Sequence, residues 1–203
     1  MLAVPVGVLA AWRARTWVDR VVMGLSVCGL SVPVFVLGYL LIYFFAIRLG
    51  WLPVQGYVSL AQGLWPCLRS IVLPSLALGS IYMALIARIT RASLLEVLEE
   101  DYVRTAHAKG LSTLTVVVTH ALRNASIPIV TIIGVGLTLL IGGVVITESV
   151  FAIPGIGRLT VDAILRRDYP IIQAVILLSS GVYVMVNLVI DLVYTVLDPR
   201  IRY

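Results

Sequence analysis

The stretch Asn124–Thr147, NASIPIVTIIGVGLTLLIGGVVIT, contains no charged residue. Three further runs share this property: Val21–Ile47, Ser70–Ala87 and Tyr169–Ile190. Each is close to the roughly 20 residues with which a helix crosses the hydrocarbon core of a membrane. Because a backbone in lipid must satisfy its own hydrogen bonds, we expect four full membrane-spanning helices. The sequence therefore predicts an all-α fold, a polytopic membrane helix bundle.

The overall composition agrees with a membrane protein. Of the 203 residues, 61% are hydrophobic and 12% are charged, whereas soluble domains are about 25% charged. The alternative, long core helices of a soluble protein, fits these values poorly. The net charge of +5 indicates contact with lipid headgroups, and no basic patch interleaved with aromatic residues points to nucleic acid.

The chain opens with a short apolar segment, Met1–Trp12. As a helix it would cover only about 18 Å, too little to span a membrane alone. It lacks the preceding basic stretch and the following small-residue cleavage site of a signal peptide. We interpret it as a half-span, the second half of a helix. We therefore expect the chain to be a fragment, or its start codon to be assigned too late. The chain 1–203 is predicted to form one transmembrane domain.

Lysine and arginine are distributed unevenly between the connecting segments, and in membrane proteins the richer side is cytoplasmic. Most of the 15 fall on one side, in the segments 13–20 and 88–123 and in the C-terminal tail. These are Arg13, Arg15, Arg20, Arg88, Arg91, Arg104, Lys109, Arg123, Arg200 and Arg202. The other side has Arg48, Arg69, Arg158, Arg166 and Arg167. We expect the first side to face the cytoplasm.

Prolines and glycines indicate where the spans begin, bend and pack. Pro128 and Pro170 fall where a first helical turn is expected, and Pro199 would stop the last helix. Pro33 lies inside a span and predicts a kink. Close packing against neighbouring helices is the expected role of four glycines, Gly134, Gly136, Gly142 and Gly143.

The two cysteines and two histidines are too scattered to form a site. Cys28 lies within a span and Cys67 in an outer loop, so we expect no disulfide. Together with His107 and His120 they give no metal-ligand spacing. We predict neither a metal nor a cofactor.

The inner segment 88–123 is unusually long for a connection. Ser93-x-x-Glu96 has capping-box spacing, although it is equally a polar surface where the preceding helix leaves the membrane. One apolar stripe follows at helical spacing, through Leu95, Leu98, Tyr102 and Ala106. Gly110 is placed to end this helix.

A second helix is predicted directly after the glycine. Ser112 can cap it, and its apolar face would comprise Leu111, Leu114, Val118 and Leu122. The turn between the helices would present Ala106, Ala108 and Gly110, small residues that allow close approach by another surface. The pattern alone fits equally well an amphipathic helix resting on lipid and a docking knob for a cytoplasmic partner.

The segment 101–134, DYVRTAHAKGLSTLTVVVTHALRNASIPIVTIIG, resembles the cytoplasmic loop of binding-protein-dependent ABC importer permeases. More narrowly, it is similar to the B-type inner-membrane subunit of dipeptide and oligopeptide importers. The broad family has the sequence Glu-Ala-Ala followed, after three residues, by Gly. In this chain these positions are Arg104-Thr105-Ala106 and Gly110. The family's later Leu-Pro is Leu122-Arg123, so the broad pattern is only partly kept. The peptide subgroup's Arg-Thr-Ala-x-Ala-Lys-Gly is matched closely.

Two further segments carry the same resemblance, 147–174 (TESVFAIPGIGRLTVDAILRRDYPIIQA) and 186–202 (VNLVIDLVYTVLDPRIR). Together the resemblance covers essentially the whole chain. In full-length relatives another span and a large outer segment come first, which agrees with the half-span expected here.

The resemblance implies a role for the inner loop and a set of partners. In this family the loop is a coupling helix seated in a groove of an ATPase subunit, and ATP-driven closure switches the spans between inward- and outward-facing states. The contact would fall on Arg104, Thr105, Ala106, Ala108, Lys109, Gly110 and Leu111. Expected partners are a paralogous second permease, two ATP-binding subunits, an extracytoplasmic substrate-binding protein and membrane lipid of a bacterial or archaeal plasma membrane. The sequence has no Gly-x-x-x-x-Gly-Lys-Ser/Thr motif, so it is not expected to be an enzyme itself.

The outer segment Glu148–Gly157 is a candidate gate. Pro154, Gly155 and Gly157 cannot continue a regular helix, so the chain must turn there. Phe151 and Ile153 could then fold back over the mouth of a pathway as a hydrophobic plug. An ordinary turn at the membrane surface is equally compatible.

The last span carries one polar stripe, Ser180, Tyr183, Asn187, Asp191 and Tyr194. Polar residues in a span usually face other helices or a water-filled path. We favour structural roles, namely helix contacts and an arginine partner for Asp191, over substrate contact.

Rival functions remain within and outside transport. Relatives of this type carry peptides, glutathione, nickel chelates or opines, and no residue pattern separates them. An intramembrane hydrolase would need a nucleophile and a base facing each other within the spans, yet both histidines lie in the inner segment. The third alternative is a scaffold that does not transport.

Overall fold

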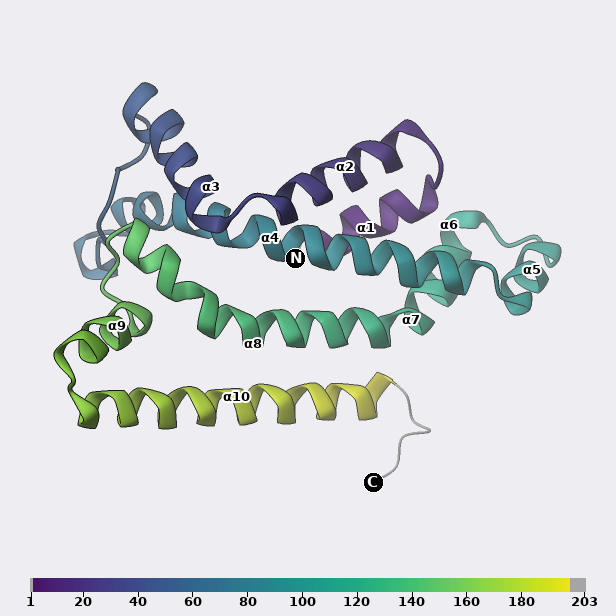
Figure 1. Cartoon of the computed structure of the whole chain (residues 1–203). Coiled ribbons are helices and arrows are strands. Elements are labelled where there is room, and N and C mark those ends of the chain that lie inside the picture. The colour runs from purple at the N-terminus through teal and green to yellow at the C-terminus, as the bar shows by residue number, and fades with distance from the viewer. Residues whose placement is uncertain (1, 198–203) are drawn as a thin grey trace. The chain divides into compact units, whose positions relative to one another are not determined.

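The computed structural model describes residues 2–197, with the backbone alone described at 141–143, 196 and 197. No strand occurs in that range, which confirms the all-α prediction (Figure 1). The helices are α1 Ala3–Trp12, α2 Trp17–Ser31, α3 Val34–Leu41, η1 Ile42–Arg48, η2 Leu60–Gln62, α4 Leu64–Leu98, α5 Asp101–Ala108, α6 Thr113–Thr115, η3 Val116–Ala121, α7 Leu122–Asn124, α8 Ser126–Val150, α9 Ile156–Arg166 and α10 Tyr169–Leu197.

Two of these helices, α4 and α10, are long and apolar enough to cross a membrane. The number rises to four if each of two interrupted helix pairs is counted as one span, Trp17–Ser31 with Val34–Arg48 and Thr113–Asn124 with Ser126–Leu140. The four predicted spans correspond to these segments. The chain thus has the helices of a multi-pass membrane protein.

The predicted kink at Pro33 is a full interruption. Helix α2 ends at Ser31 and α3 begins at Val34, with Pro33 in extended conformation (φ −58°, ψ 140°) as the residue before the new helix. Proline has no N–H to donate to the preceding turn, and its ring displaces the carbonyl four residues back. The Pro33 carbonyl instead accepts from Leu37 N at 3.1 Å and starts α3.

The described residues form two compact units, each assembled from segments far apart in the sequence. Unit 1 comprises residues 2–30, 82–136 and 186–197, and unit 2 comprises residues 31–81 and 137–185. Helices α4, α8 and α10 contribute residues to both units. The prediction of a single domain stays a prediction.

Unit 1 is built on a face of α4. Helix α1 buries only small residues, Ala3, Gly7, Ala10 and Ala11, and small residues allow helix backbones to approach closely in lipid. A Cβ atom at Gly7 would lie 2.6 Å from the Ala87 carbonyl oxygen and 2.7 Å from Thr90 Cβ. The α1–α4 contact therefore requires glycine at position 7.

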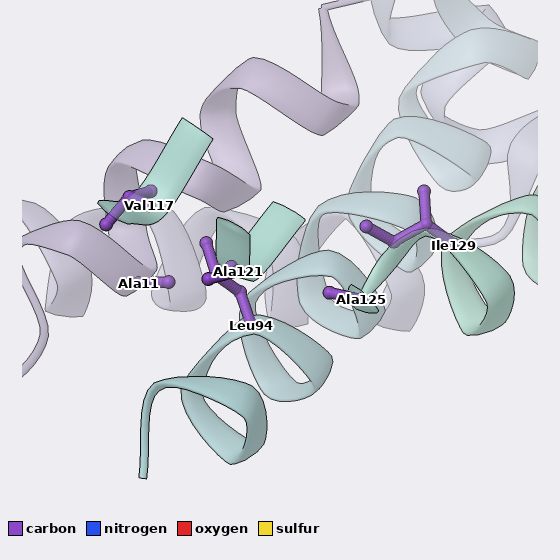
Figure 2. Packing of buried hydrophobic residues seen from close by; sticks show 6 residues of the cluster. All are labelled: Ala11, Leu94, Val117, Ala121, Ala125 and Ile129. Carbon is purple, nitrogen blue, oxygen red and sulfur yellow. The ribbon is translucent and has the colours of Figure 1, made fainter. Parts of the chain in front are cut away.

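The hydrophobic core of unit 1 joins α1 and α4 to the helices that follow the turn between α5 and α6, here called the inner turn. Figure 2 shows its buried side chains, which come from α1, α4, η3 and α8 and the residue before α8: Ala11, Leu94, Val117, Ala121, Ala125 and Ile129. Leu94 and Ala121 are fully buried. The core thus links the start of the chain to both sides of the inner turn.

Two of the four glycines predicted to pack against other helices do so. A Cβ at Gly134 would overlap Ile190 of α10, and one at Gly136 would lie 3.3 Å from Tyr82 of α4. The surroundings of Gly142 and Gly143 lie outside what the structure describes. Helix α10 is also linked to α8 by a hydrogen bond of 2.7 Å from the Tyr194 hydroxyl to Thr131 Oγ1.

The predicted helix starts are confirmed. Pro128 lies in the first turn of α8, and Pro170 is the second residue of α10. Asp168 precedes α10, and its carboxylate accepts from Ile171 N at 3.4 Å. Pro199, Arg200 and Arg202 lie outside the described residues. Cys28 and Cys67 are both free cysteines.

We predict that Gly7→Ala lowers the free energy of unfolding by about 1–3 kcal/mol, as overpacking of a close contact does. The measurement is reversible denaturation of the purified chain in detergent. Gly24→Ala is the matched control, because a Cβ at this helical glycine meets no atom within 4 Å. It should be neutral or slightly stabilising, since alanine favours helix over glycine. Equal effects of the two variants would contradict the close α1–α4 contact.

Candidate functional site

The inner turn between α5 and α6 is closed by its own backbone hydrogen bonds. Gly110 has φ +82°, a conformation that glycine adopts readily. Its N–H donates to the His107 carbonyl at 2.9 Å, and Leu111 N donates to the Ala106 carbonyl at 3.3 Å. Ser112 caps the next helix, with Oγ accepting from Thr115 N at 3.3 Å. The predicted glycine stop and serine cap are both confirmed.

A small internal core supports this turn. Val103, Ala106 and Val116 are buried together, with Leu98 packed against them. Asn124 Nδ2 also donates to the Tyr102 hydroxyl at 2.8 Å and ties α5 to the end of α7. The side chain of Ala106, one of the residues predicted to contact an ATPase, lies in this core. A contact of Ala106 with a partner stays a prediction.

The remaining residues predicted to contact an ATPase are exposed. They are Arg104, Thr105, Ala108, Lys109, Gly110 and Leu111. Arg104 pairs with Asp101 at 3.5 Å, but both side chains are more than three-quarters exposed, and such pairs contribute little. The tip of the turn, Ala108–Leu111, therefore combines small residues with one positive charge and one leucine. We call this segment the coupling tip.

Two details of the predicted loop differ in the structure. Ser93 lies in the interior of α4 and caps no helix; α5 begins instead at Asp101. The buried face after the turn is Val116, Val117 and Ala121, whereas Leu114 and Val118 are more than half exposed. The segment Val116–Ala121, which follows Leu114, is a π-helix, and its wider turns rotate Val118 and later side chains away from the positions that α-helical spacing predicts.

The outer turn after α8 is built around a buried carboxylate. Glu148 is 7% exposed, and its Oε2 accepts from Arg158 N at 2.8 Å, in the first turn of α9. A Cβ at Gly155 would overlap this carboxylate, and one at Gly157 would lie 2.7 Å from Val145 Cα. The predicted turn is confirmed at residues 151–155, but Gly157 belongs to α9.

Phe151 is part of the core of unit 2. Its side chain is 3% exposed and packs with Ile42, Leu73, Ala77 and Val150. Its carbonyl accepts from Gly56 N at 2.8 Å, and the Val150 carbonyl accepts from Gln55 Nε2 at 3.0 Å. The end of α8 is thus fixed to the outer segment before α4. A plug made by Phe151 stays a prediction, and the ring is buried in this conformation.

Sequence reasoning missed α9, which occupies the segment predicted as an outer loop. This helix buries Gly157 and Ala163 and exposes larger apolar side chains, including Ile156 and Leu165. A hollow of about 660 Å³ lies along its first turns, lined by Pro154, Gly155, Ile156, Arg158, Leu159 and Asp162. The helical signal was present as apolar residues at 156, 159 and 163, but the glycines around it indicated a turn.

A second feature that the sequence did not reveal is an ion pair in unit 1. Asp19 accepts two hydrogen bonds from Arg91, at 2.5 and 2.7 Å, and a third from Arg15 N at 2.9 Å. The Asp19 side chain is 6% exposed and that of Arg91 24%. Asp19 and Arg91 are 72 positions apart in the sequence, so no local pattern indicates that they pair.

One residue of the polar stripe of α10, Tyr194, contacts a neighbouring helix through its hydrogen bond to Thr131, and the roles of the other four stay predictions. Ser180, Tyr183 and Asp191 are exposed, and Asn187 is half-buried. Within the described residues the ion pairs are Asp19–Arg91 and Asp101–Arg104, so the predicted arginine partner of Asp191 is not seen. In the same part of the chain no group of three or more His, Cys, Asp or Glu could hold a metal ion.

Long apolar helices joined by a compact, capped inner turn define a multi-pass membrane protein. Residues 3–203 match the family described as "binding-protein-dependent transport system inner membrane component". The chain belongs to this family, as its resemblance predicted.

Individual relatives agree with this assignment. The chain is 59% identical over 202 residues to the "probable peptide ABC transporter permease protein y4tP" of Sinorhizobium fredii, covering 100% of this chain and 64% of that protein. It is 50% identical over 198 residues to the "glutathione transport system permease protein GsiC" of Escherichia coli strain K12, covering 97% of this chain and 62% of that protein. The chain thus spans slightly less than two thirds of the length of these relatives.

We predict that Gly155→Ala and Glu148→Ala each destabilise the protein by about 1 kcal/mol, the usual contribution of a helix cap. Gly155 has an extended backbone (φ −126°) that alanine also adopts, so its substitution acts only by displacing the carboxylate. Because both changes remove the same cap, the double variant should cost little more than either single variant. The measurement is a double-mutant cycle by denaturation in detergent.

Gly181→Ala serves as the control, since a Cβ there meets nothing within 4 Å. Strict additivity of the Glu148 and Gly155 variants would show that the carboxylate does not cap α9.

Proposed function

We propose that this chain belongs to the transmembrane permease subunit of an ATP-driven importer of di- and oligopeptides in a bacterial or archaeal inner membrane. It would form the translocation path with a second permease subunit, and an extracytoplasmic protein would deliver the cargo. The family match and the peptide permease of S. fredii support this proposal. The single structural observation that carries it is the exposed coupling tip on a closed internal core.

The coupling tip has the properties of a docking element. The backbone N–H groups of Lys109, Gly110 and Leu111 donate to carbonyls of α5, so the tip is held in shape by bonds within the loop. Ala108 and Gly110 allow close approach, and Leu111 is 38% exposed and offers an apolar contact. An element that keeps its shape can pass a rigid-body movement to the helices attached to it. These properties favour the docking knob over an amphipathic helix resting on lipid.

Energy would come from separate ATP-binding subunits, because the sequence has no phosphate-binding loop of the Gly-x-x-x-x-Gly-Lys-Ser/Thr type. Nucleotide can shift the permease between two states only through its different affinity for them. A tip that fits the ATPase groove in both states would transmit this difference, and affinity for nucleotide and for cargo would then be coupled reciprocally.

Glutathione is the second candidate cargo, because the E. coli relative is named as a glutathione permease. The relative named as a peptide permease has the higher identity, 59% against 50%. We therefore expect an unlabelled dipeptide to compete with labelled tripeptide uptake by the assembled transporter more strongly than glutathione does. Stronger competition by glutathione than by the dipeptide would contradict the peptide assignment and favour glutathione as the cargo.

We predict that Ala108→Glu reduces peptide uptake by about tenfold or more while the chain still inserts and assembles. The substitution places an unpaired carboxylate in the proposed contact, which is costly once desolvated. Uptake and ATP hydrolysis are measured with the complete transporter in proteoliposomes. Ala92→Glu is the matched control, because Ala92 is an exposed helical alanine of α4 outside the coupling tip.

The control should import peptide at the wild-type rate. Wild-type uptake by Ala108→Glu in fully assembled complexes would contradict the docking of this tip.

A further inference from the structure

A partly buried ion pair joins the beginning of α2 to α4, with Asp19 buried and Arg91 24% exposed. Asp19 lies in the first turn of α2 and is 4% exposed. Its two carboxylate oxygens accept from Arg91 Nε and Nη2 at 2.5 and 2.7 Å, and Arg15 N adds a bond of 2.9 Å to Oδ2. Paired N–H donors of arginine match both oxygens of a carboxylate and fix the relative orientation of the two side chains.

The ion pair lies on the same face of α4 that carries α1. Ala87, Thr90 and Leu94 are 0–1% exposed, and with Arg91 they recur at the three- and four-residue spacing of one helix face. Gly7 fits against Ala87 and Thr90, and Ala11 packs in one cluster with Leu94. The hairpin of α1 and α2 is therefore attached to α4 by close backbone packing, apolar burial and a paired charge.

This stretch of α4 leads directly into the coupling tip. Helix α4 ends at Leu98, and α5 begins three residues later at Asp101. Leu98 packs against the core of unit 1 and also against the small core of Val103, Ala106 and Val116. The hairpin, the end of α4 and the support of the coupling tip thus form one continuous packed body.

From the sequence alone, Asp19 and Arg91 would be expected to lie on the inner side and to interact with lipid headgroups. The structure gives them a different environment, because Asp19 is buried and fully engaged while Arg20 beside it is exposed. Exposed ion pairs hold neighbouring elements weakly. This pair differs because the Asp19 carboxylate is buried, so loss of Arg91 leaves a buried charge uncompensated.

We propose that Asp19 and Arg91 are positioning residues that clamp the α1–α2 hairpin to the base of the coupling tip, so that movement of the tip carries the hairpin with it. This inference rests on the proposed function, since it assumes that an ATPase moves the tip. Without the clamp, ATP hydrolysis continues but less of the movement reaches the membrane helices. The signature is a changed ratio of ATP hydrolysed to peptide imported, which a merely weakened fold would not produce in assembled complexes.

The test uses the complete transporter in proteoliposomes with four variants of this chain. Asp19→Asn and Arg91→Gln each remove one charge, and Asp19→Arg combined with Arg91→Asp exchanges the two charges. Asp19→Glu keeps the charge but lengthens the side chain. Glu96→Gln is the control, a neutralised exposed carboxylate on α4. Peptide uptake, ATP hydrolysis and the apparent KM for ATP are measured for each, with crosslinking of Lys109 to an ATPase subunit as a separate readout of docking.

We expect each charge-removing variant to raise the ATP-to-peptide ratio by roughly threefold or more, with the KM for ATP and the Lys109 crosslink unchanged. The exchanged pair should lower the ratio toward the wild-type value, and Glu96→Gln should leave it unaltered. A wild-type ratio in assembled Asp19→Asn and Arg91→Gln complexes would overturn the clamp, as would an exchanged pair no better than the single variants.

If the charge-removing variants fail to assemble, Asp19→Glu decides the matter in their place. A raised ratio in its assembled complexes supports the clamp, and a wild-type ratio overturns it. Failure of the proposed function has a different result, because then the wild-type complex itself imports no peptide or Lys109 crosslinks to no ATPase subunit.

Discussion

Close packing against one face of α4 is the interaction on which unit 1 depends. In lipid the apolar side chains of two helices gain little from leaving water, so association requires van der Waals contact and buried polar pairs. The face from Ala87 to Leu94 meets these requirements with small or fully buried side chains and Arg91. Helix α1 packs Gly7 and Ala11 against this face, and the core continues into η3 and α8.

Unit 2 is organised by a different constraint, the carbonyl groups that the end of α8 leaves without helical partners. Gln55 and Gly56 supply donors to Val150 and Phe151, and Glu148 in turn caps α9. A segment proposed as a gate therefore has many internal partners. If it moves during transport, α9 and the outer segment before α4 would have to move with it or exchange these bonds.

The sequence predicted those features that depend on local chemistry. Charge-free runs predicted the spans, Gly110 and Ser112 predicted the inner turn, and Pro33 predicted an irregularity in a span. Features set by long-range contact escaped prediction. The inward direction of Ala106 depends on Val116, the π-helix shifts the buried face, and Asp19 is distinguished from its charged neighbours only by Arg91. The role proposed for the inner loop comes from family resemblance, because the residue pattern alone fits a lipid-bound helix equally well.

The central claim is that the coupling tip stands on the cytoplasmic side and contacts an ATP-binding partner. The most direct measurement places a photo-crosslinking amino acid at Lys109 in cells that contain the complete transporter and identifies the crosslinked protein by mass spectrometry. The account predicts a crosslink to an ATP-binding subunit whose yield changes when nucleotide is trapped. A crosslink only to lipid, or labelling of Lys109 from outside the cell, would contradict it.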